Sequence, residues 1–212
     1  MAVYPERREV DVPLRDGSTV RVRPVRADDR DELRAFFERL SDDSRAFRFF
    51  SGAVNLDRMA EWAVDVDYAT RYGLVATSGE EGRIVGHGSY VGGERGRAEV
   101  AFAIADEVQG QGLGTILLAH LAEAAAENRI GLFEAEVLPD NHKMVEVFRE
   151  SGFPIETSSL PGTIKVELPT SFSAEARERF ENRDRIAAPP RCDGSCSRAP
   201  SRSWAPPGSA AP

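Results

Sequence analysis

The fold is decided by residues 98–115, which read A-E-V-A-F-A-I-A-D-E-V-Q-G-Q-G-L-G-T. The first seven residues alternate large apolar side chains with small or acidic ones, which predicts a strand with one open face. The glycines that follow give the backbone access to dihedral angles that other residues avoid, and they let amide groups approach a ligand. A long apolar helix is predicted from residue 112 to about residue 128. Backbone NH groups should therefore converge at a helix N-terminus, where the helix dipole favours an anion such as a pyrophosphate.

Two other glycine-rich phosphate loops fit this stretch poorly. A nucleotide-triphosphatase loop requires Gly-Lys-Ser/Thr, and this stretch contains no lysine. A dinucleotide-binding fold places its glycines directly after the first strand of a parallel sheet, with an acid about 20 residues later. The strands predicted here are short and closely connected, as in an antiparallel meander. A turn that merely connects a strand to a helix is the remaining alternative at this point.

The rest of the chain predicts a sheet flanked by helices. Period-two patterns and short apolar runs predict strands over residues 18–25, 72–77, 84–91, 98–104, 132–137, 155–159 and 163–168. Helical periodicity predicts helices over 28–40, with Asp28 as the N-cap, over 56–66 and over 141–151, and a helix or turn over 41–50. We therefore predict an α/β fold with a mixed, mostly antiparallel sheet.

We divide the 212 residues into four parts, because one core plus a tail suits this length. Residues 1–11 are a lead-in, 12–170 the folded domain, 171–188 a charged helix and 189–212 a tail. The tail is rich in Pro, Ser, Ala, Gly and Arg without an apolar period, so we expect it to be disordered. This composition is also typical of GC-rich DNA read in the wrong frame, and our hypothesis is that the tail is a frameshift remnant of a longer fusion protein.

Composition and charge exclude several classes of function. No apolar run approaches the roughly 18 residues that span a membrane, and the N-terminus shows no secretory signal, so we expect a cytoplasmic protein. The formal net charge of -8 argues against a nucleic-acid partner. Cys192 and Cys196 lie in the tail, which leaves the folded domain without a thiol for covalent catalysis. Their C-x-x-x-C spacing without a nearby histidine is too little for a zinc site, and we expect no metal.

The glycine-rich stretch resembles the hallmark of the GNAT superfamily of N-acetyltransferases, Q/R-x-x-G-x-G/A, at Gln109, Gly112 and Gly114. The resemblance covers about residues 12–168. It implies the GNAT acyl-CoA N-acyltransferase fold, in which the sheet splays open between its fourth and fifth strands and acetyl-CoA lies in the cleft. Those strands would be residues 98–104 and 132–137.

A second match is Asn141, which precedes a helix that Gly152 and Phe153 follow. The resemblance implies that Asn141 contacts the coenzyme, and it can cap the helix as well. Backbone NH groups that the splay leaves unpaired are expected to hold the acetyl carbonyl and the pantetheine. The coenzyme-binding residues predicted in this way are Phe102, Ala103, Ile104, Gln109, Gly110, Gln111, Gly112, Leu113, Gly114, Thr115 and Asn141.

The predicted catalytic residue is Glu99. A lysine amine is protonated at neutral pH, so its acetylation requires a base, and a carboxylate beside the cleft can serve. A solvent-exposed glutamate at a strand end is the alternative interpretation. Glu99 occupies the position of the general base in the bacterial protein lysine acetyltransferases that modify acyl-CoA synthetases, in a similar A-E-x-A-F context. Residues 41–50 also resemble the L-S-x-x-S-R-x-x-R-F segment of that subgroup.

The chain departs from the superfamily at Phe148, where many members carry a tyrosine that protonates the departing thiolate. No general acid is therefore predicted. A thiol of pKa about 8.5 can leave as the thiolate. His87 and His142 are isolated, and we assign neither a role.

The sequence thus predicts an acetyl-CoA-dependent N-acetyltransferase, whose partners are an acyl-CoA and an amine acceptor, namely a protein lysine. A GNAT enzyme acting on a small amine, such as a polyamine, an amino acid or an aminoglycoside, is an alternative, because the same loop would serve both. A non-catalytic acyl-CoA sensor, in which Glu99 is only structural, is another.

Overall fold

The computed structural model describes residues 3–51, 54–79 and 81–171. Its eight strands form one sheet in the order β1-β2-β3-β4-β5-β6-β8-β7. All neighbouring strands are antiparallel except β5 and β6, which confirms the predicted mixed, mostly antiparallel sheet. The strands are β1 Val10–Pro13, β2 Thr19–Pro24, β3 Arg71–Ser78, β4 Arg83–Gly92, β5 Arg97–Ile104, β6 Leu132–Val137, β7 Glu156–Leu160 and β8 Thr163–Pro169.

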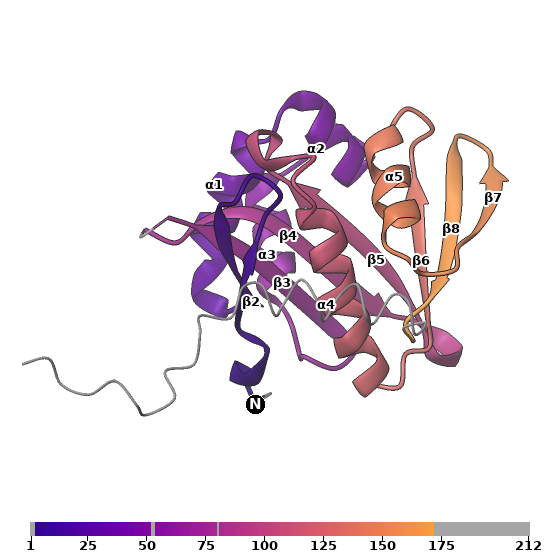
Figure 1. Cartoon of the computed structure of the whole chain (residues 1–212), viewed down its shortest axis with the longest axis horizontal. Coiled ribbons are helices and arrows are strands. Elements are labelled where there is room, and N and C mark those ends of the chain that lie inside the picture. Colours follow the sequence, from indigo (N-terminus) through magenta and orange to yellow (C-terminus); the bar gives the residue numbers. More distant parts are fainter. Residues whose placement is uncertain (1–2, 52–53, 80, 172–212) are drawn as a thin grey trace, which may run out of the picture.

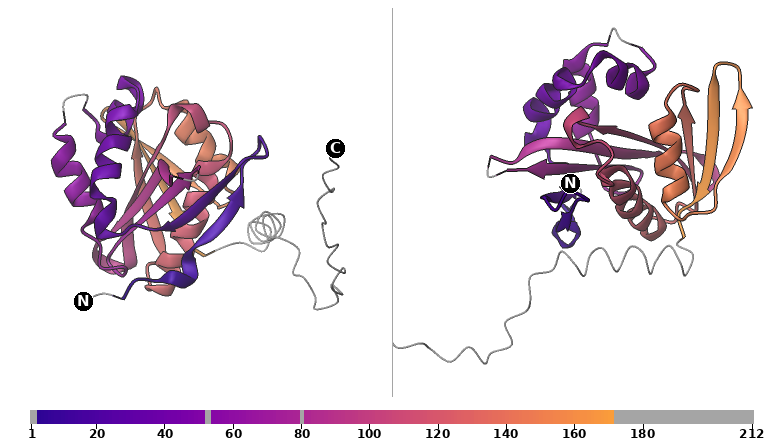
Figure 2. Two further views of the ribbon diagram at one scale, coloured as in Figure 1. Left: turned by 90° about the vertical axis from the view of Figure 1, so that its left-hand side faces the viewer. Right: turned by 45° about the horizontal axis from the view of Figure 1, so that its top comes forward.

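Helices cover both faces of the sheet (Figures 1 and 2). They are α1 Arg30–Arg39, α2 Asp42–Phe49, α3 Leu56–Val64, α4 Leu113–Glu127 and α5 His142–Glu150. Phe37 of α1 contacts the ring of His87 in β4, with 5.8 Å between the ring centroids. Leu113 and Leu117 of α4 lie against the neighbouring Gly86. Because successive strand residues face opposite sides, α1 and α4 pack on opposite faces of the sheet.

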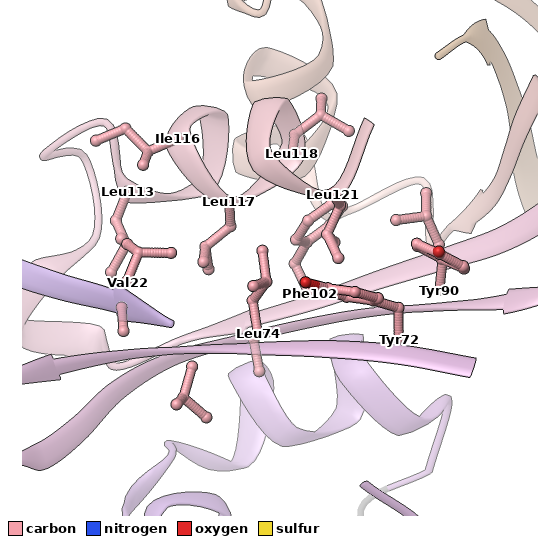
Figure 3. Packing of buried hydrophobic residues seen from close by; sticks show 14 of the residues in the cluster. Val22, Tyr72, Leu74, Tyr90, Phe102, Leu113, Ile116, Leu117, Leu118 and Leu121 are labelled. Carbon is pink, nitrogen blue, oxygen red and sulfur yellow. The ribbon is translucent and has the colours of Figure 1, made fainter. Parts of the chain in front are cut away.

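The core between α4 and the sheet holds the strand that leads into the glycine turn. Figure 3 shows Leu117 and Leu121 of α4 directed toward the sheet, where Leu74 and Tyr72 lie. All four side chains are buried. Burial of each of the three leucines stabilises the fold by roughly 1.5–3 kcal/mol. Helix α4 is therefore anchored firmly on this face of the sheet.

Strands β5 and β6 separate after three residue pairs. Arg97 pairs with Leu132, and the parallel ladder ends at Glu99 and Glu134. Both strands continue beyond this point, β5 to Ile104 and β6 to Val137. Figure 1 shows the two strands together at one end and diverging toward α5 at the other. The predicted splay between residues 98–104 and 132–137 is confirmed.

The start of α1 differs from the prediction. Asp28 lies inside a 3-10 turn, Ala27–Asp29, and does not cap the helix, which begins at Arg30. The carboxylate of Asp29 accepts hydrogen bonds from the guanidinium of Arg23 at 2.6 and 2.7 Å, and another from the backbone NH of Arg26. This ion pair holds the turn against β2, and the N-cap position of α1 falls at Asp29, one residue later than predicted.

The N-terminal boundary also differs. Strand β1 begins at Val10, inside the expected lead-in of residues 1–11, because Val10 pairs with Val22 of β2. Beyond residue 171, the predicted charged helix (171–188) and tail (189–212) lie outside the described residues. Within the described ranges, no helix is long and apolar enough to cross a membrane.

Candidate active site

A cavity of about 1120 Å³ opens where β5 and β6 separate. It is bounded by α2, the end of β5, the glycine turn and α5. Of the residues that the sequence predicted for the site, all except Gln111 line it. These are Glu99, Phe102, Ala103, Ile104, Gln109, Gly110, Gly112, Leu113, Gly114, Thr115 and Asn141.

The glycine turn adopts a backbone conformation that explains its composition. Gly110 and Gly112 have φ angles of 77° and 87°, in the left-handed region that favours glycine. The first hydrogen bond of α4 runs from the NH of Ile116 to the carbonyl of Gly112, at 3.2 Å. The amides of residues 113–115 precede it and have no acceptor within the helix. The first turn of α4 carries no acidic residue that would repel an anion, so the helix dipole favours an anion at this end.

Gly114 serves the packing of two helices. A Cβ atom at this position would lie 3.0 Å from a methyl carbon of Val147 in α5, closer than ordinary contacts allow. The absence of a side chain therefore brings α5 against α4. Asn141 begins α5, and its Oδ1 accepts a hydrogen bond from the NH of Met144 at 3.1 Å. The predicted helix cap is confirmed, and Asn141 also faces the cavity.

The two glutamines of the turn form hydrogen bonds with other segments of the chain. The Nε2 of Gln109 lies 3.1 Å from the carbonyl oxygen of Ile104, and its Oε1 accepts a hydrogen bond from Lys143 at 2.7 Å. The carbonyl of Gln111 accepts a hydrogen bond from the NH of Arg15 at 3.1 Å. The side chain of Gln109 is thus engaged within the chain, and Gln111 joins the turn to the β1–β2 hairpin.

Two cations at the cavity were not identified from the sequence. Arg15 comes from the β1–β2 hairpin, and its guanidinium donates to the carbonyl of Gly110 at 3.3 Å and to Glu150 at 2.7 Å. Lys143 comes from the first turn of α5. Arg15 and Gly110 are 95 residues apart, so only the folded chain brings them together. In a chain of net charge -8, these cations favour an anion beside the glycine turn.

Glu99 is exposed and lines the cavity at the point where the two strands part. Arg48 of α2 lines the same cavity, and its charge interacts with that of Glu99. Burial lowers the pKa of Arg48 to about 10, although Glu99 opposes this shift. The Nε of Arg48 is shielded from solvent, without a hydrogen-bond partner among the described residues. An acid and a cation therefore meet at one wall of the cavity.

Of the remaining candidates, His142 at the start of α5 is the one titratable group that lines the cavity. His87 is fully buried outside the cavity lining, and burial together with the charge of Arg48 lowers its pKa to about 3. Phe148, at the position of the superfamily's tyrosine, is buried and lines the cavity. Among the described residues, no group of three or more His, Cys, Asp or Glu could hold a metal.

The profile of the acetyltransferase (GNAT) family matches residues 30–153. The chain belongs to the GNAT acetyltransferase family. It is 37% identical over 119 residues to an acetyltransferase of Pseudomonas aeruginosa, covering 54% of this chain and 64% of that protein. It is 30% identical over 145 residues to the acetyltransferase Pat of Mycolicibacterium smegmatis, covering 68% of this chain and 44% of Pat. The chain spans less than two thirds of the length of either relative.

Among solved structures, the GNAT domain of S. lividans PAT superimposes with a TM-score of 0.72 at 36% identity. The match covers 79% of this chain and 99% of that domain. The predicted resemblance to the GNAT superfamily and to the bacterial protein acetyltransferases is confirmed.

Proposed function

We propose that the chain is an acetyl-CoA-dependent N-acetyltransferase that transfers an acetyl group directly to a lysine amine of another protein. The observation that carries the proposal is the position of Glu99. This carboxylate marks the point where β5 and β6 separate, and it shares one cavity with the glycine turn at the start of α4. A proton acceptor and an anion-binding helix end thus face the same space.

The cavity fits the coenzyme in size, and the glycine turn at one end of it offers backbone amides and a nearby cation to the diphosphate. Its volume of about 1120 Å³ lies slightly above the range of roughly 300–1,000 Å³ for small-molecule sites, which suits an extended molecule. The amides of residues 112–115 would hold the diphosphate, with the α4 dipole and Arg15 supporting the negative charge. The edge of β5 that β6 leaves unpaired, over residues 102–104, would hold the pantetheine.

Glu99 would remove a proton from the acceptor ammonium, directly or through a water molecule. The neutral amine nitrogen then attacks the thioester carbonyl carbon and forms the new C–N bond, while NH groups of β5 donate to the carbonyl oxygen. The C–S bond breaks and the CoA thiolate leaves. The nitrogen releases its second proton to water as the amide forms, and the thiolate takes a proton from water. Phe148 cannot supply that proton, which agrees with a leaving group that needs no acid.

The relatives support acetylation of a protein, and within that class we propose a lysine as the acceptor. The two relatives named Pat and PAT match this chain at 30% and 36% identity. The sequence context of Glu99 further resembles the enzymes that modify acyl-CoA synthetases, so we propose such a synthetase as the acceptor protein.

The test is incubation of the chain with acetyl-CoA and a purified acyl-CoA synthetase, followed by mass spectrometry of the tryptic peptides. We expect acetyl-lysine that depends on the chain and is absent with Glu99→Gln. Faster acetylation of a polyamine, an amino acid or an aminoglycoside than of the synthetase would reject the protein acceptor. Binding of acetyl-CoA without transfer to any acceptor would reject the enzyme in favour of a sensor.

A further inference from the structure

The serines of the segment 41–50 bind the carboxylate of Asp106. The NH of Ser41 donates to Oδ2 of Asp106 at 2.9 Å, and the hydroxyl of Ser41 donates to Oδ1 at 2.8 Å. The hydroxyl of Ser44 donates to the same Oδ1 at 2.7 Å. These residues are 62 and 65 positions apart from Asp106 in the sequence. One carboxylate thus takes three hydrogen bonds from the N-terminal end of α2.

Asp106 belongs to the 3-10 turn Asp106–Val108, which leads directly into the glycine turn. Gln109, the next residue, donates through Nε2 to the hydroxyl of Ser44 at 3.1 Å and to Asp106 at 3.4 Å. Lys143 of α5 donates to the Oε1 of Gln109 at 2.7 Å. We call Ser41, Ser44, Asp106 and Gln109 the α2 latch. The latch joins α2 to the start of the glycine turn, and Lys143 extends it to α5.

The charge of Asp106 makes the latch strong. Partial burial raises the pKa of Asp106, but the hydrogen bonds from Ser41 and Ser44 outweigh this effect and hold the pKa below its usual value. The carboxylate is therefore ionised at neutral pH. It also lies at the positive end of the α2 dipole, where a negative charge is stabilised. Hydrogen bonds to an ionised acceptor are about twice as strong as neutral ones.

Helix α2 has no fully buried side chain, so this contact contributes to holding it in place. The neighbouring α1, by contrast, buries Leu33, Phe36 and Phe37. The apolar attachment of α2 comes from the half-buried Phe49, whose ring centroid lies 5.2 Å from that of Phe37. The opposite end of α2 carries Arg48 to the cavity wall beside Glu99. A rigid helix of this length transmits the position of its first turn to its last over about 12 Å.

We propose that Asp106 is a positioning residue that couples the coenzyme turn to α2. Ordering of the turn by acetyl-CoA orders α2 through the latch, and this fixes the wall of the cavity that receives the acceptor. The inference rests on the proposed function for the identity of the two ligands. In this coupling, Ser41 and Ser44 supply the hydrogen bonds from α2 to Asp106, which gives both serines a structural role.

Hydrogen exchange measured by mass spectrometry, with and without saturating acetyl-CoA, tests the coupling. In the unmodified chain we expect acetyl-CoA to slow exchange both in residues 109–116 and in α2. In Asp106→Ala and in Ser44→Ala, protection of 109–116 should persist and protection of α2 should be lost. The matched control is Glu107→Ala, since Glu107 contacts Arg83 at 3.0 Å and does not line the cavity.

Steady-state kinetics provide a second readout that a purely structural role would not move. We expect Asp106→Ala to raise the KM for the acceptor about tenfold, and the KM for acetyl-CoA less than about threefold. Protection of α2 that survives in both latch variants would overturn the inference. So would protection of residues 109–116 without any change in α2 of the unmodified chain. If acetyl-CoA protected neither region of the unmodified chain, the proposed function itself would fail.

Discussion

Glu99 is the last residue of β5 that pairs with β6, and its partner in the register is Glu134. The surroundings of the two carboxylates differ. Glu134 contacts Lys165 and Arg97, and hydrogen bonds from these two cations hold its pKa below its usual value. Glu99 lines the cavity, where Arg48 is the nearby cation. One acid is thus held between cations in a surface network, and the other faces the space where an amine can bind.

This difference predicts the effect of removing either charge. We expect Glu99→Gln to lower kcat by about 10²- to 10⁴-fold, the usual contribution of a general base, because the amide cannot accept the ammonium proton. The Kd for acetyl-CoA, measured by calorimetry, should change less than about twofold. The matched control is Glu134→Gln, which should keep kcat while lowering the midpoint of thermal unfolding. Near-normal turnover in Glu99→Gln would end the assignment.

The sequence predicts the sheet and the glycine turn because both depend on local patterns. Alternation in β2 and β5, and the long apolar run of α4, reflect burial on one side or on all sides of an element. The four residues of β1 are too few to establish such a period, so the local pattern does not separate Val10 from the lead-in. Asp28 was predicted as a cap because the ion pair of Asp29 with Arg23 cannot be read from the local sequence.

The parts of the site that were missed depend on contacts between distant segments. Arg15 reaches the glycine turn from a hairpin 95 residues earlier, and Asp106 meets Ser44 across 62 residues. Positive charge at Arg15 was visible in the sequence, but its destination was not. The local pattern predicts a helix or turn over residues 41–50, but the hydrogen bonds of this segment to Asp106 depend on the fold.

Because the backbone at Gly112 is left-handed, we expect replacement of this glycine to lower the affinity for acetyl-CoA. Alanine in this conformation costs roughly 1–2 kcal/mol, so the turn of Gly112→Ala should be displaced from its binding conformation. We expect the Kd for acetyl-CoA to rise about tenfold, which corresponds to about 1.4 kcal/mol.

The matched control is Gly162→Ala, because Gly162 has a similar φ of 85° and lies in the turn between β7 and β8. Equal losses of thermal stability are expected in both variants, with a loss of acetyl-CoA binding in Gly112→Ala alone. Unchanged affinity in Gly112→Ala would show that the conformation of the turn does not matter for the coenzyme.

Arg15 predicts a salt-dependent contribution to coenzyme binding. Its guanidinium lies beside the glycine turn, where it can attract the phosphates of CoA across partly exposed surface. We expect Arg15→Gln to raise the KM for acetyl-CoA about three- to fivefold at low ionic strength, and less at 0.5 M salt, because ions screen exposed charges. Arg21→Gln in β2 is the control, since Arg21 contacts Glu9 outside the cavity lining. Equal effects of the two substitutions would contradict the assignment.

Because His87 is buried in the folded chain, we expect the fold to lose stability in mild acid. Burial lowers its pKa to about 3 in the folded chain, whereas an exposed histidine has a pKa of about 6.5. Between these values the unfolded chain binds more protons, so the free energy of unfolding falls as the pH falls, by up to roughly 1.4 kcal/mol per pH unit. His120, whose pKa burial lowers to about 4, should add a similar slope.

Urea unfolding between pH 4.5 and 6.5 measures these slopes. The variant His87→Leu should lose the part of the slope that His87 contributes and retain the part from His120. The double variant with His120→Leu should lose both. An identical pH dependence in the unmodified chain and in His87→Leu would show that His87 is protonated in the folded state.

The most direct test of the account is the structure of the chain with CoA bound. We predict that the diphosphate accepts hydrogen bonds from backbone amides of residues 112–115. The sulfur should lie between the separated ends of β5 and β6, within reach of the Glu99 carboxylate directly or through one water molecule. A diphosphate bound away from the glycine turn, or a sulfur directed away from Glu99, would contradict the central claim.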